Sequence, residues 1–180
     1  MGAGRNKSFF ILLLAGALLG APRAYAQVLV AVVGDSNVAG TAVASGERYP
    51  AQLERALKAK GLDVRVHNGG QNGDTTSGLL GRLSSAAPEG TKVAVVWIGV
   101  NDRRRGASDG EIQAGRQRVV AALKARGIEV YAVGPSVYSM ELHKNPKHTV
   151  ADGHFNAAGY AMMVGRTLGS VQALVTRAKK

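Results

Sequence analysis

Four short apolar runs, each followed by a glycine within a few residues, constrain the fold of this chain more than any other feature. The first run, residues 28–33, contains only valine, leucine and alanine and ends at Gly34. A strand that is apolar on both sides is typical of a parallel sheet covered on both faces, because none of its positions needs to face water. Residues 64–66, 93–98 and 128–133 are also mostly apolar, with Arg65 and Glu129 as their charged members. We therefore predict four parallel strands at these positions.

Longer stretches between the runs carry apolar residues three or four positions apart, which predicts helices. These helices are expected to begin near Pro50, after a cap at Thr76 or Ser77, after a cap at Ser108, and shortly before Tyr160. Gly61 and Gly127 end the first and third of them. Alternation of strand and helix requires a parallel sheet with helices on both faces and right-handed crossovers. Residues 136–151 are polar and offer no convincing fifth strand, so we expect a loop there.

The first 26 residues have the layout of a secretory signal peptide. Two basic residues precede an apolar stretch at residues 9–19, and an A-x-A cleavage motif follows at residues 24–26. The apolar stretch is shorter than the ~20 residues that a membrane-spanning helix needs, and an uncleaved N-terminal anchor is the alternative. We expect a signal peptide over residues 1–26, a single mature domain over residues 27–180, and export to the periplasm or the medium without stable membrane insertion.

The chain carries a formal net charge of +11 and has no cysteine. Arg5, Lys7 and Arg23 would leave with the signal, which lowers the charge to +8. A basic surface can attract nucleic acid, an anionic cell envelope or acidic lipids. However, the basic residues are dispersed and no aromatic residues alternate with them, so we expect a solvated surface and no nucleic-acid partner. The lack of cysteine excludes disulfides, thiolate metal sites and a cysteine nucleophile.

Four polar segments follow the predicted strands or open the last helix. They read Gly34-Asp35-Ser36-Asn37, Asn68 to Asp74, Gly99-Val100-Asn101-Asp102, and Asp152 to Asn156. Ligands in an open parallel sheet bind beyond the carboxyl ends of the strands, so these segments are expected at one edge. That edge would hold a serine, a glycine-rich turn, an asparagine and a histidine, a set suited to acyl transfer.

Each of these residue types has a chemical role in acyl transfer. A serine hydroxyl becomes a nucleophile when a base removes its proton, and a histidine, with an ordinary pKa of ~6.5, suits that role. An attacked ester carbonyl becomes an oxyanion that needs hydrogen-bond donors. The backbone N–H groups of Ser36 and Gly73 and the side-chain amide of Asn101 could supply three, and His154 could supply the base.

The four segments resemble the sequence blocks of the GDSL/SGNH hydrolase family, over nearly the whole mature chain. The resemblance implies a flavodoxin-like three-layer α/β/α sandwich with a parallel sheet of four to five strands. It also implies Ser36 as nucleophile, His154 as base, and an oxyanion hole from Ser36, Gly73 and Asn101. Small exported members of this family include arylesterases, thioesterases and lysophospholipases.

Two positions depart from the family pattern. The family usually has an aspartate three residues before the histidine, where this chain has Ala151. Asp152 is two residues before His154, so either it reaches the imidazole through a shortened turn or the site works as a Ser-His dyad. We favour Asp152 as the residue that orients the base. The nucleophile block reads GDSN instead of GDSL, which we regard as minor variation.

Several other polar residues have more than one interpretation. Asp35 and Asp102 are expected to accept backbone hydrogen bonds that fix the turns, and Asp74 to act in a turn. Arg103, Arg104 and Arg105 either attract an anionic substrate group or form a solvated loop. The spacing of His67, His143 and His148 matches no compact ligand motif, so neither a metal nor a cofactor is expected. Trp97 is expected in the core.

The function expected from these residues is hydrolysis of carboxylic esters on a small-molecule or carbohydrate substrate. The first alternative is a polysaccharide O-deacetylase of the same fold. A second alternative, motivated by Ala151, is a non-catalytic member that binds envelope components through its basic surface. A nucleotide-binding flavodoxin-like domain is more distant, because the turn after the first strand lacks the lysine and glycine pattern of a P-loop. The sequence does not indicate an oligomeric state.

Overall fold

Four parallel strands form the sheet, as the apolar runs predict. A computed structural model describes Met1 and residues 27–179, so the predicted signal peptide, apart from Met1, lies outside the described residues. The strands run in the spatial order β2-β1-β3-β4, so the first strand of the chain lies inside the sheet. Their bounds are β1 (Val28–Gly34), β2 (Val64–Gly70), β3 (Thr91–Trp97) and β4 (Glu129–Ala132).

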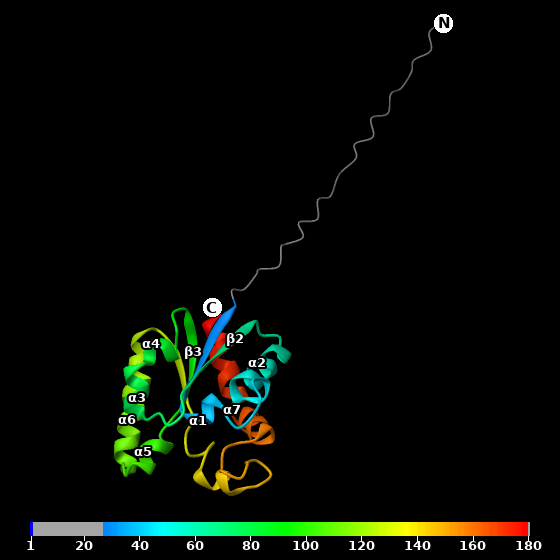
Figure 1. The fold of residues 1–180 in the computed structure, drawn as a ribbon. Coiled ribbons are helices and arrows are strands. Elements are labelled where there is room, and N and C mark those ends of the chain that lie inside the picture. Colours follow the sequence, from blue (N-terminus) through cyan, green and yellow to red (C-terminus); the bar gives the residue numbers. More distant parts are fainter. Residues whose placement is uncertain (2–26, 180) are drawn as a thin grey trace.

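Helices cover both faces of this sheet (Figure 1). The helices are α1 (Ser36–Ala39), α2 (Tyr49–Ala59), α3 (Thr76–Gly81), α4 (Leu83–Ala86), α5 (Val100–Arg104), α6 (Asp109–Ala125) and α7 (Ala157–Ala178). Two 3₁₀ turns lie at Ser45–Glu47 and Met140–Lys144. The strand order is that of the first four strands of a flavodoxin-like sheet, so the predicted three-layer α/β/α sandwich is confirmed, with four strands.

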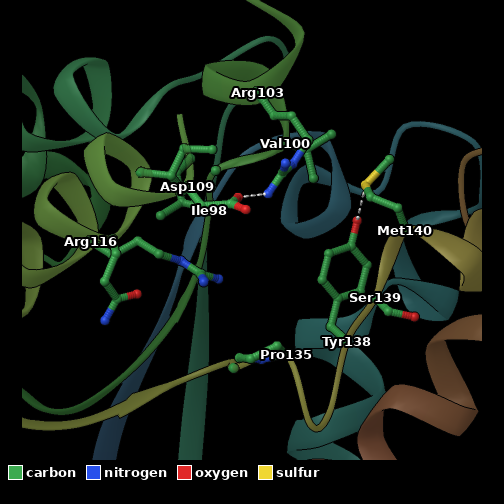
Figure 2. A pocket seen from close by; sticks show the side chains of 13 residues that line it. Ile98, Val100, Arg103, Asp109, Arg116, Pro135, Tyr138, Ser139 and Met140 are labelled. Atoms are coloured by element: carbon green, nitrogen blue, oxygen red, sulfur yellow. Dashed lines mark hydrogen bonds and ion pairs between the residues drawn. The ribbon is translucent and has the colours of Figure 1, made fainter. Parts of the chain in front are cut away.

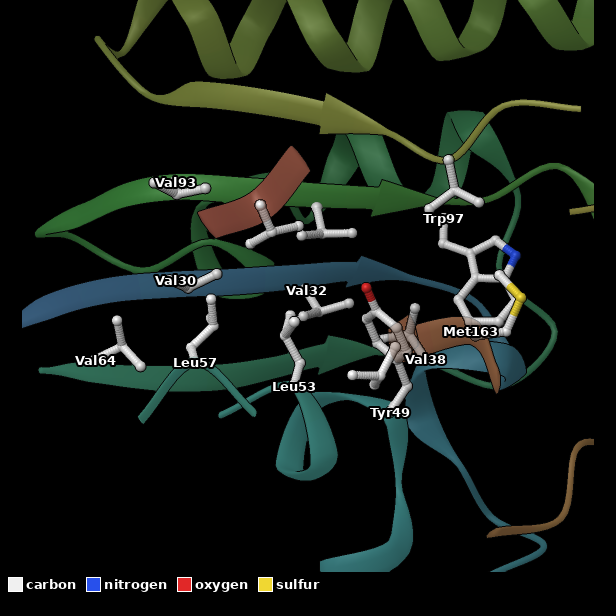
Figure 3. Packing of buried hydrophobic residues seen from close by; sticks show 14 of the residues in the cluster. Val30, Val32, Val38, Tyr49, Leu53, Leu57, Val64, Val93, Trp97 and Met163 are labelled. Atoms are coloured by element: carbon white, nitrogen blue, oxygen red, sulfur yellow. The ribbon is translucent and has the colours of Figure 1, made fainter. Parts of the chain in front are cut away.

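Alternate residues of β1 supply the two halves of the core. Val30 and Val32 face α2 and α7, whose leucines and aromatic residues pack on them (Figure 3). Ala31 and Val33 face the opposite layer, where α3, α4 and α6 supply leucines and Val119. All four strand residues are fully buried. This explains why the run is apolar at every position, because side chains that point to opposite faces of the sheet both meet a helix layer.

Helix boundaries follow the predicted signals in two cases and differ in one. Ser108 caps α6 through a reciprocal pair with Glu111, and Pro50 lies in the first turn of α2. The predicted cap of α3 at Thr76 or Ser77 is wrong. Thr75 caps this helix, because its hydroxyl oxygen accepts from the Gly78 N–H at 3.1 Å.

The segment from residue 136 to residue 151 is a loop with one 3₁₀ turn, and it contributes no fifth strand among the described residues. It packs over the carboxyl ends of the strands at the start of α7 (Figure 1). Of the helices in the described part of the chain, none is long and apolar enough to cross a bilayer.

The register of the strands brings the polar segments together. Gly34 at the end of β1 pairs with Gly70 of β2 and with Trp97 of β3. The Ser36 segment, the glycine-rich turn and the Asn101 segment therefore leave the sheet at adjacent points. This is the common edge that the sequence predicts.

Leu53 of α2 tests the core on the α2 and α7 face. Its side chain is fully buried, so Leu53→Ala is expected to lower the free energy of unfolding by about 2–5 kcal/mol. Leu80→Ala in α3 is the matched control, because Leu80 is 37% exposed. This substitution should change the free energy of unfolding by less than about 0.5 kcal/mol. Denaturant unfolding of the two variants measures the difference. Equal losses would contradict this account of the core.

Candidate active site

The turn after β1 presents Ser36 at the first position of α1. Asp35 caps this short helix, because its Oδ1 accepts from the Asn37 backbone N–H at 3.0 Å and from the Asn37 side chain at 3.1 Å. Gly34 has no space for a side chain, since an added Cβ would lie 1.9 Å from the Trp97 carbonyl oxygen. The turn is thus fixed by a glycine that permits close approach to β3 and by a buried cap.

Asp35 is fully buried, and its second carboxylate oxygen has no hydrogen-bond partner. Burial raises the pKa of this carboxyl from 3.8 to about 6, against the lowering effect of the hydrogen bonds from Asn37. The nearby carboxylate of Asp74 raises the pKa further, and the positive charge of Arg104 lowers it. Asp35 thus has the structural role expected from the sequence, with an unexpected affinity for a proton.

A pH series tests the protonation state of the Asp35 carboxyl. Because its pKa is higher in the folded chain than in the unfolded chain, its contribution to stability is full below about pH 4 and is lost as the pH rises through about 6. Relative to Asp35→Asn, which keeps an acceptor for the cap, the wild type should lose about 2 kcal/mol of unfolding free energy between pH 4 and pH 7. Urea unfolding of both proteins at several pH values measures this, and a constant difference would contradict it.

A tight turn before α7 holds His154. The Gly153 N–H donates to the Val150 carbonyl at 2.9 Å, the Val150 N–H donates back to the His154 carbonyl at 2.9 Å, and Gly153 has a φ of +86°. This left-handed conformation suits glycine and closes the turn. Ala151, where the family pattern has its aspartate, is exposed at the tip.

Asp152 reaches His154 from within this turn. Its Oδ1 accepts the backbone N–H of His154 at 2.9 Å and lies 3.0 Å from the ring Nδ1. The second contact is off the line of a ring hydrogen bond, so it is an electrostatic contact. The backbone N–H of His154, followed by its ring, lowers the pKa of Asp152. The side chain of Asp152 is 64% exposed and that of His154 is 27% exposed, so water weakens the pair.

His143 supports the same turn from the loop before it. Its Nδ1 lies 2.6 Å from the Gly153 carbonyl oxygen. Because a carbonyl can only accept, Nδ1 carries the proton, and Nε2 accepts from the Tyr138 hydroxyl. The His143 ring packs on Phe155 with 4.8 Å between centroids, and burial lowers its pKa. His143 is therefore a neutral bridge that fixes the segment carrying His154.

Ser36 and His154 line one small pocket. Asn37, Val100, Arg104, His143 and Gly153 complete its wall. The structure therefore brings together the serine and the histidine that the sequence singles out, with Asp152 beside the histidine. Arg104 is exposed, and its guanidinium forms no hydrogen bond or ion pair among the described residues.

Gly73 and Asn101 lie on two turns that are joined to each other. The Asn101 side-chain amide donates to the Asp74 carbonyl oxygen at 2.9 Å, one residue after Gly73. Gly73 has a φ of +73°, a conformation that favours glycine. Its N–H and that of Ser36 donate no hydrogen bond within the described part of the chain. Two backbone donors and one amide hydrogen of Asn101 are thus available at this edge.

Asp102 joins the third segment to α3. Its carboxylate accepts the Thr76 backbone N–H at 3.0 Å and the Thr76 hydroxyl at 2.6 Å. This is the structural role expected from the sequence. Thr76 packs in turn against Gly115 of α6, where an added Cβ would lie 2.3 Å from the Thr76 hydroxyl oxygen.

The three consecutive arginines have three different environments. Arg103 forms an ion pair with Asp109, and Arg105 donates to the Gly73 carbonyl at 3.0 Å. Arg104 alone lines the pocket with Ser36.

The remaining expectations from the sequence concern Trp97 and a possible metal site. Trp97 is fully buried and packs edge-on to Tyr49, with ring centroids 5.6 Å apart, so the core prediction is confirmed. Among the described residues, no three histidine, aspartate or glutamate side chains gather as a metal site would require.

Sequence reasoning missed the Asp74–Arg82 pair. Asp74 is buried, and its Oδ2 lies 2.6 Å from the Arg82 Nη2. The same guanidinium donates to the Gly34 and Gly69 carbonyl oxygens, each at 3.0 Å. The signal that could have indicated it was an arginine three residues after Leu79 and directly before Leu83, at the junction of α3 and α4. The position of His143 had no such signal, because its loop has no periodicity.

The fold and this edge define a three-layer α/β/α protein with a serine and a histidine at the ends of its strands. Residues 32–152 match the GDSL-like lipase/acylhydrolase family, and the chain belongs to it. It is 35% identical over 127 residues to Esterase TesA of Pseudomonas aeruginosa, which covers 68% of this chain and 63% of that protein. It is 33% identical over 100 residues to an arylesterase of Vibrio mimicus, which covers 55% of this chain and 50% of that one.

The chain thus matches less than two thirds of the length of either relative. A crystal structure of TesA has the same fold, with a TM-score of 0.72 and 24% identity over 82% of this chain and 99% of that one.

Proposed function

We propose that this chain hydrolyses carboxylic esters through an acyl-enzyme on Ser36. The observation that carries the proposal is the shared pocket of Ser36 and His154, with Asp152 beside Nδ1 of the imidazole ring. The family membership and the names of the two relatives, an esterase and an arylesterase, support the same reaction class. The carboxylate of Asp152 also weakens the case for a non-catalytic member, which rested on Ala151.

The proposed mechanism assigns one atom to each proton transfer. Asp152 beside Nδ1 favours the tautomer of His154 that carries its proton there, so Nε2 is free to accept. Nε2 takes the proton of Ser36 as Oγ attacks the ester carbonyl, and it then gives that proton to the leaving alcohol. A water molecule repeats the sequence on the acyl-enzyme, so that the acid is released and Ser36 regains its proton.

Three donors would stabilise the oxyanion of each tetrahedral intermediate. They are the N–H groups of Ser36 and Gly73 and the free amide hydrogen of Asn101. The bond from Asn101 to the Asp74 carbonyl fixes the orientation of the amide before substrate arrives, so little reorganisation is needed during the reaction.

We further propose that the chain is exported to the periplasm or the medium after cleavage of residues 1–26. This part of the proposal rests on the basic start, the apolar stretch and the A-x-A motif of the sequence.

Ser36→Ala tests the nucleophile. It should abolish hydrolysis of a short-chain nitrophenyl ester, a loss of ~10³-fold or more, with no change in the unfolding midpoint. In the wild type, an organophosphonate should label Ser36 covalently, which peptide mass spectrometry locates. Ser170→Ala, at an exposed position of α7, is the matched control and should retain both properties. Undiminished turnover in Ser36→Ala, or folded wild type that resists labelling, would contradict the proposal.

Asp152→Asn distinguishes a triad from a dyad. Loss of the charge beside Nδ1 should lower kcat about 10- to 100-fold. This is less than the ~10⁴-fold loss caused by neutralising a buried triad carboxylate, because the Asp152 side chain is 64% exposed. Asp63→Asn removes an exposed carboxylate at the opposite end of the sheet and should have no effect. An unchanged kcat in Asp152→Asn would show that the site works as a dyad.

A further inference from the structure

A larger pocket lies beside the one that holds Ser36. Its volume is about 450 Å³, and Ile98, Gly99 and Val100 form the wall nearest the Asn101 turn. The two pockets share Val100, and the hydrogen bond between Tyr138 and His143 joins a wall residue of each. The two pockets are therefore neighbours, and a group attached to an ester at Ser36 would be directed toward this space past Val100.

The wall of this pocket is mainly apolar. Ile98, Val100, Ile112, Pro135, Met140 and the ring of Tyr138 contribute to it (Figure 2). Such a surface favours a short hydrocarbon or aryl group, since its burial removes apolar area from water.

Arg116 from α6 introduces a positive charge into this apolar space (Figure 2). It is half-buried, and its Nη2 donates to the Val133 carbonyl at 2.8 Å. Its Nε is buried with no partner, and burial lowers its pKa. A guanidinium has five N–H donors, so most of those of Arg116 are unused.

Arg116 forms no ion pair with a carboxylate of the described chain. The charges of Asp35 and Asp102 act on it from a greater distance, and these carboxylates hold the turn at Asn37 and the start of α3 at Thr76. Arg103 at the rim differs, because its charge is paired with Asp109 within the same wall (Figure 2). A partly desolvated cation without a counter-ion is costly, and an anionic ligand removes that cost.

We propose that this protein prefers esters that carry a carboxylate on an apolar arm, and that Arg116 binds that carboxylate in the pocket beside Ser36. A planar guanidinium with parallel free donors matches the geometry of a carboxylate. The inference rests on the proposed esterase function, and it names the substrate class of the same site.

Two matched substrate pairs test the preference on either arm of the ester. For the acyl arm, 4-nitrophenyl hydrogen adipate is compared with 4-nitrophenyl hexanoate. For the alcohol arm, 4-carboxyphenyl butyrate is compared with 4-carbamoylphenyl butyrate. Arg116→Gln should lower kcat/KM for the charged member of at least one pair by about 10- to 100-fold, mainly through KM, and leave the neutral member within about twofold. Spontaneous hydrolysis is subtracted, and intrinsic reactivity cancels because wild type and variant are compared on the same ester.

Three further variants serve as controls. Arg118→Gln removes the same charge from an exposed position of α6. It should leave the ratio of kcat/KM for the charged ester to kcat/KM for the neutral ester unchanged in both pairs. Arg116→Lys keeps a positive charge and the stem of the side chain, so it should fold and retain part of the preference. Arg104→Gln examines the exposed arginine in the Ser36 pocket and should affect charged esters less than Arg116→Gln does.

The outcomes separate the inference from the function on which it rests. If wild type hydrolyses the neutral esters and Arg116→Gln loses nothing on either charged ester, the inference is wrong and the esterase function stands. A loss in Arg104→Gln that matches or exceeds that in Arg116→Gln, or an equal loss in Arg118→Gln, also overturns it. If wild type hydrolyses no ester of either pair, the proposed function itself is wrong.

Discussion

The edge of the sheet that carries the site depends on one side chain, the guanidinium of Arg82. Near the ends of β1 and β2, Arg82 donates to the carbonyl oxygens of Gly34 and Gly69 while it pairs with Asp74. A lysine would satisfy these three groups less well, because only arginine has donors fixed in one plane. The glycine-rich turn held in this way accepts the amide of Asn101 at the Asp74 carbonyl. Through this chain of contacts, the turns after β1, β2 and β3 are held in fixed positions relative to one another.

Much of this arrangement could be predicted from the sequence, because the signals are local. A strand buried on both faces is apolar at every position, so β1 and β3 are evident from composition alone. In a parallel sheet their carboxyl ends share an edge, so the neighbourhood of Ser36 and Asn101 follows from topology. The capping of α6 by Ser108 follows from residues three apart. In each case the structural cause lies within a few residues of its effect.

The remaining features depend on contacts between residues far apart in the chain, which no local pattern encodes. Arg116 is spaced as an ordinary polar residue of α6, and only the fold turns it toward a cavity formed by loops before and after it. His143 belongs to a loop without periodicity, and its role depends on where Gly153 lies. Thr76 looks like a cap in the sequence, but the fold brings Asp102 to its hydroxyl and leaves the cap to Thr75. Tertiary hydrogen bonds thus outweighed local preference.

The turn that holds Asp152 has a geometric consequence for how the proposed catalytic groups are coupled. Asp152 and His154 are separated by one residue, and the same carboxylate oxygen contacts both the backbone and the ring of His154. A displacement of this turn would therefore move the carboxylate and the imidazole together. Their separation from Ser36, which lies at the start of α1, would change with such a movement. In the proposed mechanism, the position of the turn would then decide whether His154 can activate Ser36, while Asp152 stays beside the ring.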